Sequence, residues 1–154
     1  MKRPVTIAAV QLPSAAPGRT PAARQRANFD QAGHWLNEAG KRGADIACLG
    51  EIFNAAGIDL HRTDLDVPRL VRHAEAEALR RLAPIARKHR LAIVAPLLAV
   101  LDGVVRNVAV VINEQGRLIG RYCKVHCIEH EKAFGVTPGD AWPVFEVKGA
   151  RIGV

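Results

Sequence analysis

The chain has 154 residues, 49% of them apolar and 24% charged, which is the composition of one ordinary soluble globular domain. These numbers argue against a collagen-like, disordered or membrane-spanning protein, since no run approaches the roughly 18 apolar residues of a transmembrane helix. The formal net charge is +7, but only 5% of the residues are aromatic. The densest basic stretch, residues 80–90, has the spacing of a solvated helix face, which argues against a nucleic-acid partner.

The first part of the chain is predicted to alternate strands with a helix. Residues 4–12 are nearly all apolar and include β-branched side chains, which is typical of a strand buried on both faces. Their apolar run is too short for the core of a signal peptide. A helix is predicted to begin with Thr20 as its N-cap and Pro21 in its first turn, and to be stopped by Gly40 and Gly43. Residues 45–50 return to strand.

A second helix follows a polar loop, and the rest of the chain is mainly strand. Apolar residues at helical spacing mark this helix: Val71, Ala74, Ala78, Leu82 and Ile85. Pro84 lacks a backbone donor and is expected to kink the helix or to end it early. The predicted strands are residues 91–100, 104–112, 117–125, 143–147 and 150–154, the last two forming a hairpin.

This order of elements predicts a layered α/β fold. A strand, a helix, a strand and a second helix followed by strands are typical of a sandwich with its helices on one face of the sheet. The chain shows no internal repeat, linker or low-complexity tract, so we interpret it as one domain.

The three cysteines indicate a reducing compartment. Cys48, Cys123 and Cys127 are odd in number and lie within apolar or mixed segments. Reduced thiols fit this pattern better than a disulfide framework does. We therefore expect a cytoplasmic protein that makes no contact with a membrane.

Two charged residues stand where a catalytic group could be placed. Glu51 directly follows the second predicted strand, and functional groups of open α/β sheets collect at the carboxyl ends of strands, so Glu51 could be a general base. The alternative is an exposed loop glutamate. Lys124 could stabilise an oxyanion, or it could be an ordinary edge-strand lysine. Either Glu129 or Glu131 could keep Lys124 protonated if it came close.

The segment CKVHCIEH raises the question of a metal site. Cys123, His126, Cys127 and His130 would share one face of a helix, and all four are potential zinc ligands. Structural zinc sites usually close with two ligand pairs that are well separated in sequence. Two buried thiols and two loop histidines are therefore the simpler interpretation, and the zinc site remains an alternative.

Four blocks of sequence together resemble the nitrilase superfamily of carbon–nitrogen hydrolases. They are VTIAAVQL near the start, GADIACLGEIF at 43–53, RNVAVVINEQGRLIGRYCKVH at 106–126 and EKAFGVTPGDAWPVFEVKGARIGV at 131–154. They cover nearly the whole chain and occur in the family's order. The resemblance implies the N-terminal part of a four-layer αββα sandwich.

The resemblance also implies a mechanism. It assigns Glu51 as the general base, Lys124 as the cation that stabilises the tetrahedral intermediate, and Glu131 as a second glutamate that orients base and substrate. In the family these residues surround a cysteine nucleophile, whose thiolate attacks an amide, carbamoyl or nitrile carbon to form an acyl-thioester that water then hydrolyses. The family needs no metal or organic cofactor, acts on small molecules and commonly forms homo-oligomers.

The sequence departs from the family at several positions. Gly50 stands where the family usually has Pro, Cys123 where it has Arg, and Arg106 where it has an aromatic residue. The family's nucleophilic cysteine lies shortly beyond the position of Val154. We therefore expect residues 1–154 to be an incomplete domain of a longer enzyme, and this chain alone to be inactive.

The cysteines within the chain are poor replacements for that nucleophile. Strand alternation directs Cys48 away from the side of Glu51, so it is expected to pack in the core. Cys127 lies nearer to the predicted site but lacks the tight strand-end turn that positions a nucleophile. Two other functions stay open: a non-enzymatic half-domain that binds a small molecule or a partner, and a small zinc-binding or nucleic-acid-binding module.

Overall fold

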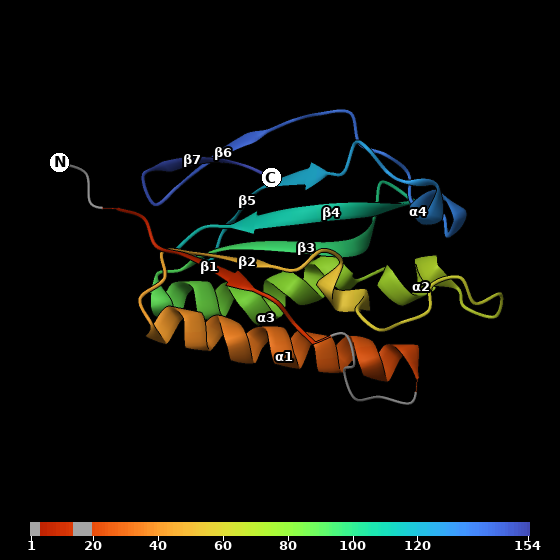
Figure 1. The fold of residues 1–154 in the computed structure, drawn as a ribbon, viewed down its shortest axis with the longest axis horizontal. Helices are drawn as coiled ribbons and strands as arrows, with labels where there is room; N and C mark the ends of the chain where they lie inside the picture. Colours follow the sequence, from red (N-terminus) through yellow and green to blue (C-terminus); the bar gives the residue numbers. More distant parts are fainter. Residues whose placement is uncertain (1–3, 14–19) are drawn as a thin grey trace.

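The computed structural model describes residues 4–13 and 20–154, and its centre is a five-stranded mixed sheet whose strand order follows the chain (Figure 1). The strands are β1 (Ile7–Val10), β2 (Ile46–Leu49), β3 (Ala92–Leu101), β4 (Val104–Ile112) and β5 (Leu118–Cys123). β1, β2 and β3 are mutually parallel, and β4 pairs antiparallel with both β3 and β5. Because β5 consequently runs in the direction of β2, both strands end at the same end of the sheet.

The helices cover one face of this sheet, as the order of elements predicts. Figure 1 shows α1 (Pro21–Lys41) and α3 (Ala74–His89) side by side against that face. The shorter elements η1 (Phe53–Ala55), α2 (Val67–Val71) and α4 (Glu129–Ala133) lie in the connections. The opposite face is partly covered by the antiparallel hairpin of β6 (Val144–Val147) and β7 (Ala150–Gly153). The predicted layered α/β class is thus confirmed.

Helix α1 begins as its sequence predicts. Thr20 is extended, and its Oγ1 accepts a hydrogen bond from the backbone N–H of Ala23 at 3.2 Å, while Pro21 occupies the first turn. The helix ends at Lys41, one residue beyond Gly40. Its buried residues recur at helical spacing and fix the side that faces the sheet: Asn28, Phe29, Ala32, Leu36 and Ala39.

The prediction that Pro84 could end its helix early is wrong, because α3 continues to His89. Pro84 lies on the exposed side of the helix, whereas Leu82, Ala83 and Ala86 are buried. The packing of these buried apolar side chains offsets the loss of the one backbone hydrogen bond that proline removes. The helix ends when Arg90 adopts the left-handed conformation, and β3 then begins at Ala92.

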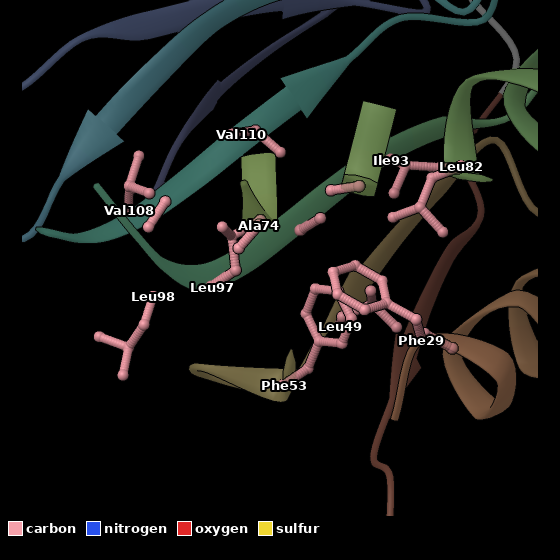
Figure 2. Close-up of a cluster of buried hydrophobic side chains, with 14 of the residues drawn as sticks. Phe29, Leu49, Phe53, Ala74, Leu82, Ile93, Leu97, Leu98, Val108 and Val110 are labelled. Carbon is pink, nitrogen blue, oxygen red and sulfur yellow. The ribbon is translucent and has the colours of Figure 1, made fainter. Parts of the chain in front are cut away.

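Apolar side chains pack on both faces of the sheet. The larger cluster lies between the sheet and the helices, where the Phe29 and Phe53 rings meet edge to face with centroids 5.2 Å apart (Figure 2). The smaller cluster lies between the sheet and the β6–β7 hairpin, and comprises Ile46, Ala92, Val94, Ala109, Val111, Phe145 and Val147. Together the two clusters hold the sheet between a helical layer and a hairpin.

Two arginines of the basic stretch at 80–90 pair with acidic residues of the helical layer. Arg80 and Arg81 both hydrogen-bond to Glu77, and Arg81 also hydrogen-bonds to Asp30.

No helix within the described residues combines the length and the apolar character that crossing a membrane requires.

Candidate active site

Three segments meet at the end of the sheet where β2 and β5 finish. Glu51 lies two residues beyond the end of β2, and Lys124 directly follows β5. Asn107 lies on β4 beside the end of β5, and its carbonyl accepts a hydrogen bond from the backbone N–H of Lys124 at 2.8 Å. The sheet topology therefore brings together residues that are far apart in the sequence.

The Lys124 ammonium lies between two carboxylates. Its Nζ is 2.7 Å from Glu51 Oε1 and 2.8 Å from Glu131 Oε2. Glu129, the other carboxylate considered from the sequence, pairs instead with Lys132 at 2.7 Å and its side chain is 89% exposed. Of the two candidate partners for Lys124 in α4, only Glu131 is placed to neutralise it.

Asn107 joins the same cluster and was not singled out from the sequence. Its side-chain Nδ2 donates to Glu51 Oε1 at 2.9 Å and to Glu131 Oε1 at 2.7 Å, so one amide bridges both carboxylates. The residue is only 5% exposed. The available signal was an uncharged polar residue in the mainly apolar segment 104–112, because a buried amide needs hydrogen-bond partners.

The two carboxylates differ in their exposure to solvent. The Glu131 side chain is 9% exposed, whereas the Glu51 side chain is 60% exposed. Burial by itself would raise the pKa of Glu131, but hydrogen bonds from Lys124, Asn107 and the Ile128 backbone N–H outweigh burial and lower that pKa. Glu131 is therefore a fixed anion, and Glu51 is the carboxylate that a substrate or water can reach.

Lys124 is held as a cation by its neighbours. Partial burial alone would lower the pKa of Lys124, but the hydrogen bonds to Glu131 and Glu51 raise it above its ordinary value. A permanently charged ammonium beside a cleft is a suitable donor to an oxygen atom that becomes negative during a reaction.

The Pro-Gly-Asp segment 138–140, called the P-G-D block below, supports Lys124 through its backbone. The backbone N–H of Gly139 donates to the carbonyl of Lys124 at 2.9 Å. Just before this block, the backbone N–H of Thr137 donates to the carbonyl of Val105, at the start of β4, also at 2.9 Å. A Cβ atom at Gly139 would lie 2.4 Å from the carbonyl oxygen of Cys123, so only glycine permits this close approach.

Two of the departures from the family pattern are accommodated. A Cβ atom at Gly50 would meet no atom within 4 Å, so this position accepts glycine as readily as a larger residue. The Arg106 guanidinium donates to the carbonyl oxygens of Thr137 and Pro138, and so attaches the P-G-D block to β4.

A cleft of about 430 Å³ opens beside the charged cluster. Glu51, Lys124 and Glu131 line it together with mainly apolar residues: Ile52, Ala55, Ala56, Ile58, Leu60, Ile128 and Phe134. His61 and His130 lie on its wall, with their Nε2 atoms 2.8 Å apart, and the Phe134 ring meets both imidazoles edge to face. The arrangement suits a small molecule with an apolar body and a polar group that faces Lys124.

The CKVHCIEH segment does not form the four-ligand cluster of the zinc interpretation. Among the described residues, no group of three or more His, Cys, Asp or Glu side chains is arranged to hold a metal ion. His130 contacts His61, and the Cys127 thiol donates to the carbonyl of Lys124 at 3.5 Å.

The three cysteines do not supply an activated thiol. Burial raises the pKa of Cys48, Cys123 and Cys127. None of these three cysteines, all of which lie in the described part of the chain, lines the cleft. Cys48 packs against the smaller apolar cluster on the hairpin side of the sheet. A raised pKa disfavours the thiolate, which is the reactive form of cysteine.

Comparison with known proteins identifies the family to which this chain is similar. The chain matches the carbon–nitrogen hydrolase family over residues 6–154. A nitrilase of Pyrococcus abyssi is 31% identical over 129 residues, which are 82% of this chain and 48% of that protein. An omega-amidase of Xenopus tropicalis is 25% identical over 136 residues, with 82% and 48% covered.

Solved structures show the same architecture. A carbon–nitrogen hydrolase from Helicobacter pylori superimposes with a TM-score of 0.77 at 19% identity, over 97% of this chain and 50% of that one. An amidase from Nesterenkonia sp. superimposes with a TM-score of 0.74 at 22% identity, over 97% and 54%. The chain therefore shares the fold of these two hydrolase structures.

The chain belongs to the carbon–nitrogen hydrolase family. It spans about half the length of the relatives that it matches.

Proposed function

We propose that the protein containing this chain hydrolyses the carbon–nitrogen bond of small amides or N-carbamoyl compounds through a cysteine thioester. The observation that carries the proposal is the position of the Lys124 ammonium, 2.7 Å from Glu51 and 2.8 Å from Glu131, beside a cleft with mainly apolar walls. A cation fixed by a buried anion can donate to the oxyanion of a tetrahedral intermediate.

Each residue then has a separate role. Glu51, the exposed carboxylate, takes the proton of the thiol, and the thiolate attacks the carbonyl carbon while Lys124 donates to the oxygen that becomes negative. Glu51 returns the proton to the departing amine or ammonia. It next takes a proton from water, which attacks the thioester and releases the acid and the thiol. Glu131 stays ionised and, with Asn107, orients Glu51 and Lys124.

The nucleophile is proposed to belong to a part of the protein that follows this chain. The resemblance to the family implies a cysteine shortly after Val154, and the raised pKa of Cys127, which burial causes, makes that residue a poor substitute. In a mutant of the amidase from Nesterenkonia sp., the acetamide moiety of fluoroacetamide is covalently added at the active-site cysteine. Residues 1–154 would then be the N-terminal part of the catalytic domain.

Small amides are favoured over nitriles as substrates. Mutants of the amidase from Nesterenkonia sp. have been solved in complex with butyramide and with acrylamide. In this chain, the apolar walls of the cleft would bury a short aliphatic acyl group while its carbonyl oxygen faces Lys124.

The test is an assay of the protein expressed from its complete reading frame. Ammonia release from butyramide, from an N-carbamoyl amine and from butyronitrile would be measured at equal concentrations. We expect turnover of the amide or the carbamoyl compound, and loss of at least about 100-fold in the Glu51→Gln variant, because the base is removed while its size is kept. Residues 1–154 expressed alone should be inactive. Full activity of Glu51→Gln would contradict the proposal.

A further inference from the structure

The turn that carries Glu51 is strained. Ile52 adopts φ 43° and ψ 41°, the left-handed conformation that β-branched residues rarely occupy. A conformation of this kind persists only where surrounding contacts enforce it, and such sites are common where a catalytic group must be presented. The turn is followed at once by η1, in which Phe53, Asn54 and Ala55 are all buried.

Asn54 attaches this turn to the sheet. The residue is fully buried, and its side chain makes two hydrogen bonds with the backbone of Leu98 on β3: Nδ2 donates to the carbonyl at 2.9 Å, and Oδ1 accepts from the N–H at 2.9 Å. β2 pairs with β3 only as far as Cys48 and Val94. Beyond Val94, the backbone of β2 no longer pairs with β3. Four residues farther along β3, at Leu98, the Asn54 side-chain amide makes the two hydrogen bonds instead.

Asn28 holds the same turn from the helical layer. It lies on α1, is 1% exposed, and its Nδ2 donates to the carbonyls of Asn54 at 3.2 Å and of Ala56 at 3.0 Å. Both amides are buried, so losing either would leave backbone groups without partners. Their bonds therefore anchor the peptide that follows Ile52 on two sides.

The anchor point on β3 is directly linked to the charged cluster. Leu98 is the register partner of Asn107, whose side chain donates to both Glu51 and Glu131. Asn54 and Asn107 therefore hold Glu51 from two sides, one through the backbone of its turn and the other through its carboxylate.

We propose that Asn54, supported by Asn28, is a positioning residue that keeps the strained Ile52 turn closed and so holds the Glu51 carboxylate at Lys124. The inference rests on the proposed function for the role of Glu51 as a base. The placement of Glu51 can also be measured without any activity.

The first test compares Asn54→Ala with Asn37→Ala in the protein from the complete reading frame. Asn37 on α1 is a matched control, because its side-chain amide also makes two hydrogen bonds, to the Gly33 carbonyl and to His89 on α3, but neither bond holds the turn that carries Glu51. Asn54→Ala should lower kcat about 10- to 100-fold with little change in KM, because a base displaced by about 1 Å loses this much. Unchanged kcat in a folded Asn54→Ala would overturn the proposal.

A second comparison separates positioning from general loss of stability. Glycine occupies the left-handed conformation without strain, so Ile52→Gly makes the turn less dependent on its anchor. The loss of kcat caused by Asn54→Ala should be smaller in the Ile52→Gly background than in the wild type. An equal loss in both backgrounds would mean that Asn54 acts only through overall stability, and the proposal would fail. If Asn54→Ala does not fold, Asn28→Ala is put through the same cycle.

Crystal structures of the variants keep this proposal distinct from the proposed function. If the wild type hydrolyses no amide, the proposed function fails, and the geometry alone then decides the positioning role. Asn54→Ala should separate Glu51 from Lys124 beyond 4 Å, the limit of an ion pair. A variant that keeps the wild-type distance of 2.7 Å would overturn the inference.

Discussion

Lys124 Nζ lies 2.7 Å from a carboxylate oxygen of Glu51, although 73 residues separate the two in the chain. The contact exists because β2 and β5 run in the same direction and end together. A second carboxylate, Glu131, reaches the same ammonium from α4. The electrostatics of the site therefore depend on all three residues at once, and the predictions below separate their contributions.

Replacing Lys124 should alter both activity and the pH dependence of stability. In Lys124→Met the Glu131 carboxylate stays buried without its cation, so its pKa should rise, because burial raises the pKa and the opposing ion pair is lost. The folded variant then binds a proton that the unfolded chain releases. Its stability relative to the wild type should therefore fall as the pH rises from about 4 to 7. Thermal melts across this range measure the effect.

The Lys132→Met variant is the control for that measurement, because Lys132 pairs only with the exposed Glu129. The melting temperature of Lys132→Met should equal that of the wild type at every pH.

The activity of Lys124→Met should fall by about 100-fold or more, as expected when an oxyanion donor is removed. A pH profile of stability identical to that of the wild type would show that Lys124 does not control Glu131.

Removing the Asn107 amide should weaken the bridge between the two carboxylates. Asn107→Leu is similar in size but leaves Glu131 Oε1 without the amide donor at 2.7 Å. A buried acceptor that loses its donor costs about 1–3 kcal/mol of unfolding free energy. Denaturant unfolding would measure this loss, and kcat should fall about 10-fold or more because Glu51 is less well held. Asn113→Ala, which disrupts only the turn between β4 and β5, should leave kcat unchanged.

A side chain at Gly139 should push the P-G-D block away from β5. Its Cβ would lie 2.4 Å from the Cys123 carbonyl oxygen, and the adjacent hydrogen bond to Lys124 would lengthen. We expect Gly139→Ala to destabilise the protein by about 1–3 kcal/mol, the usual cost of overpacking. Gly50→Ala is the matched control for stability, since a Cβ there meets no atom within 4 Å. Equal melting temperatures for the two variants would contradict this explanation of Gly139.

The contact between His61 and His130 should contribute to substrate binding rather than to the chemical step. Their Nε2 atoms lie 2.8 Å apart on the wall of the cleft. Loss of one such hydrogen bond, worth about 0.5–1.5 kcal/mol, should raise KM about 2- to 10-fold in His61→Ala with kcat nearly constant. Steady-state kinetics on butyramide would test this, with His34→Ala on α1 as the control. A fall in kcat at constant KM would assign His61 to catalysis instead.

The local sequence determined most of the secondary structure, because capping and periodicity act between neighbouring residues. Thr20 predicts the start of α1, and the segments 104–112 and 117–125, which are predicted as strands, form β4 and β5. Pro84 is one exception, since tertiary packing of the buried side of α3 outweighed a local signal. Val71 is another, because it ends the separate helix α2, and α3 begins only at Ala74. The likeness of the sequence blocks to a family also indicated Glu51, Lys124 and Glu131 as candidates.

Only the tertiary structure decided which of these groups meet and what holds them. Asn107 and Asn54 carry no local sign of their roles, because a buried amide is recognised by its partners, and those partners lie 24 to 56 residues away along the chain. The choice of Glu131 over Glu129 depends on which side of α4 faces Lys124. Contacts between residues so far apart in the chain depend on the order and direction of the strands, which residue patterns alone do not specify.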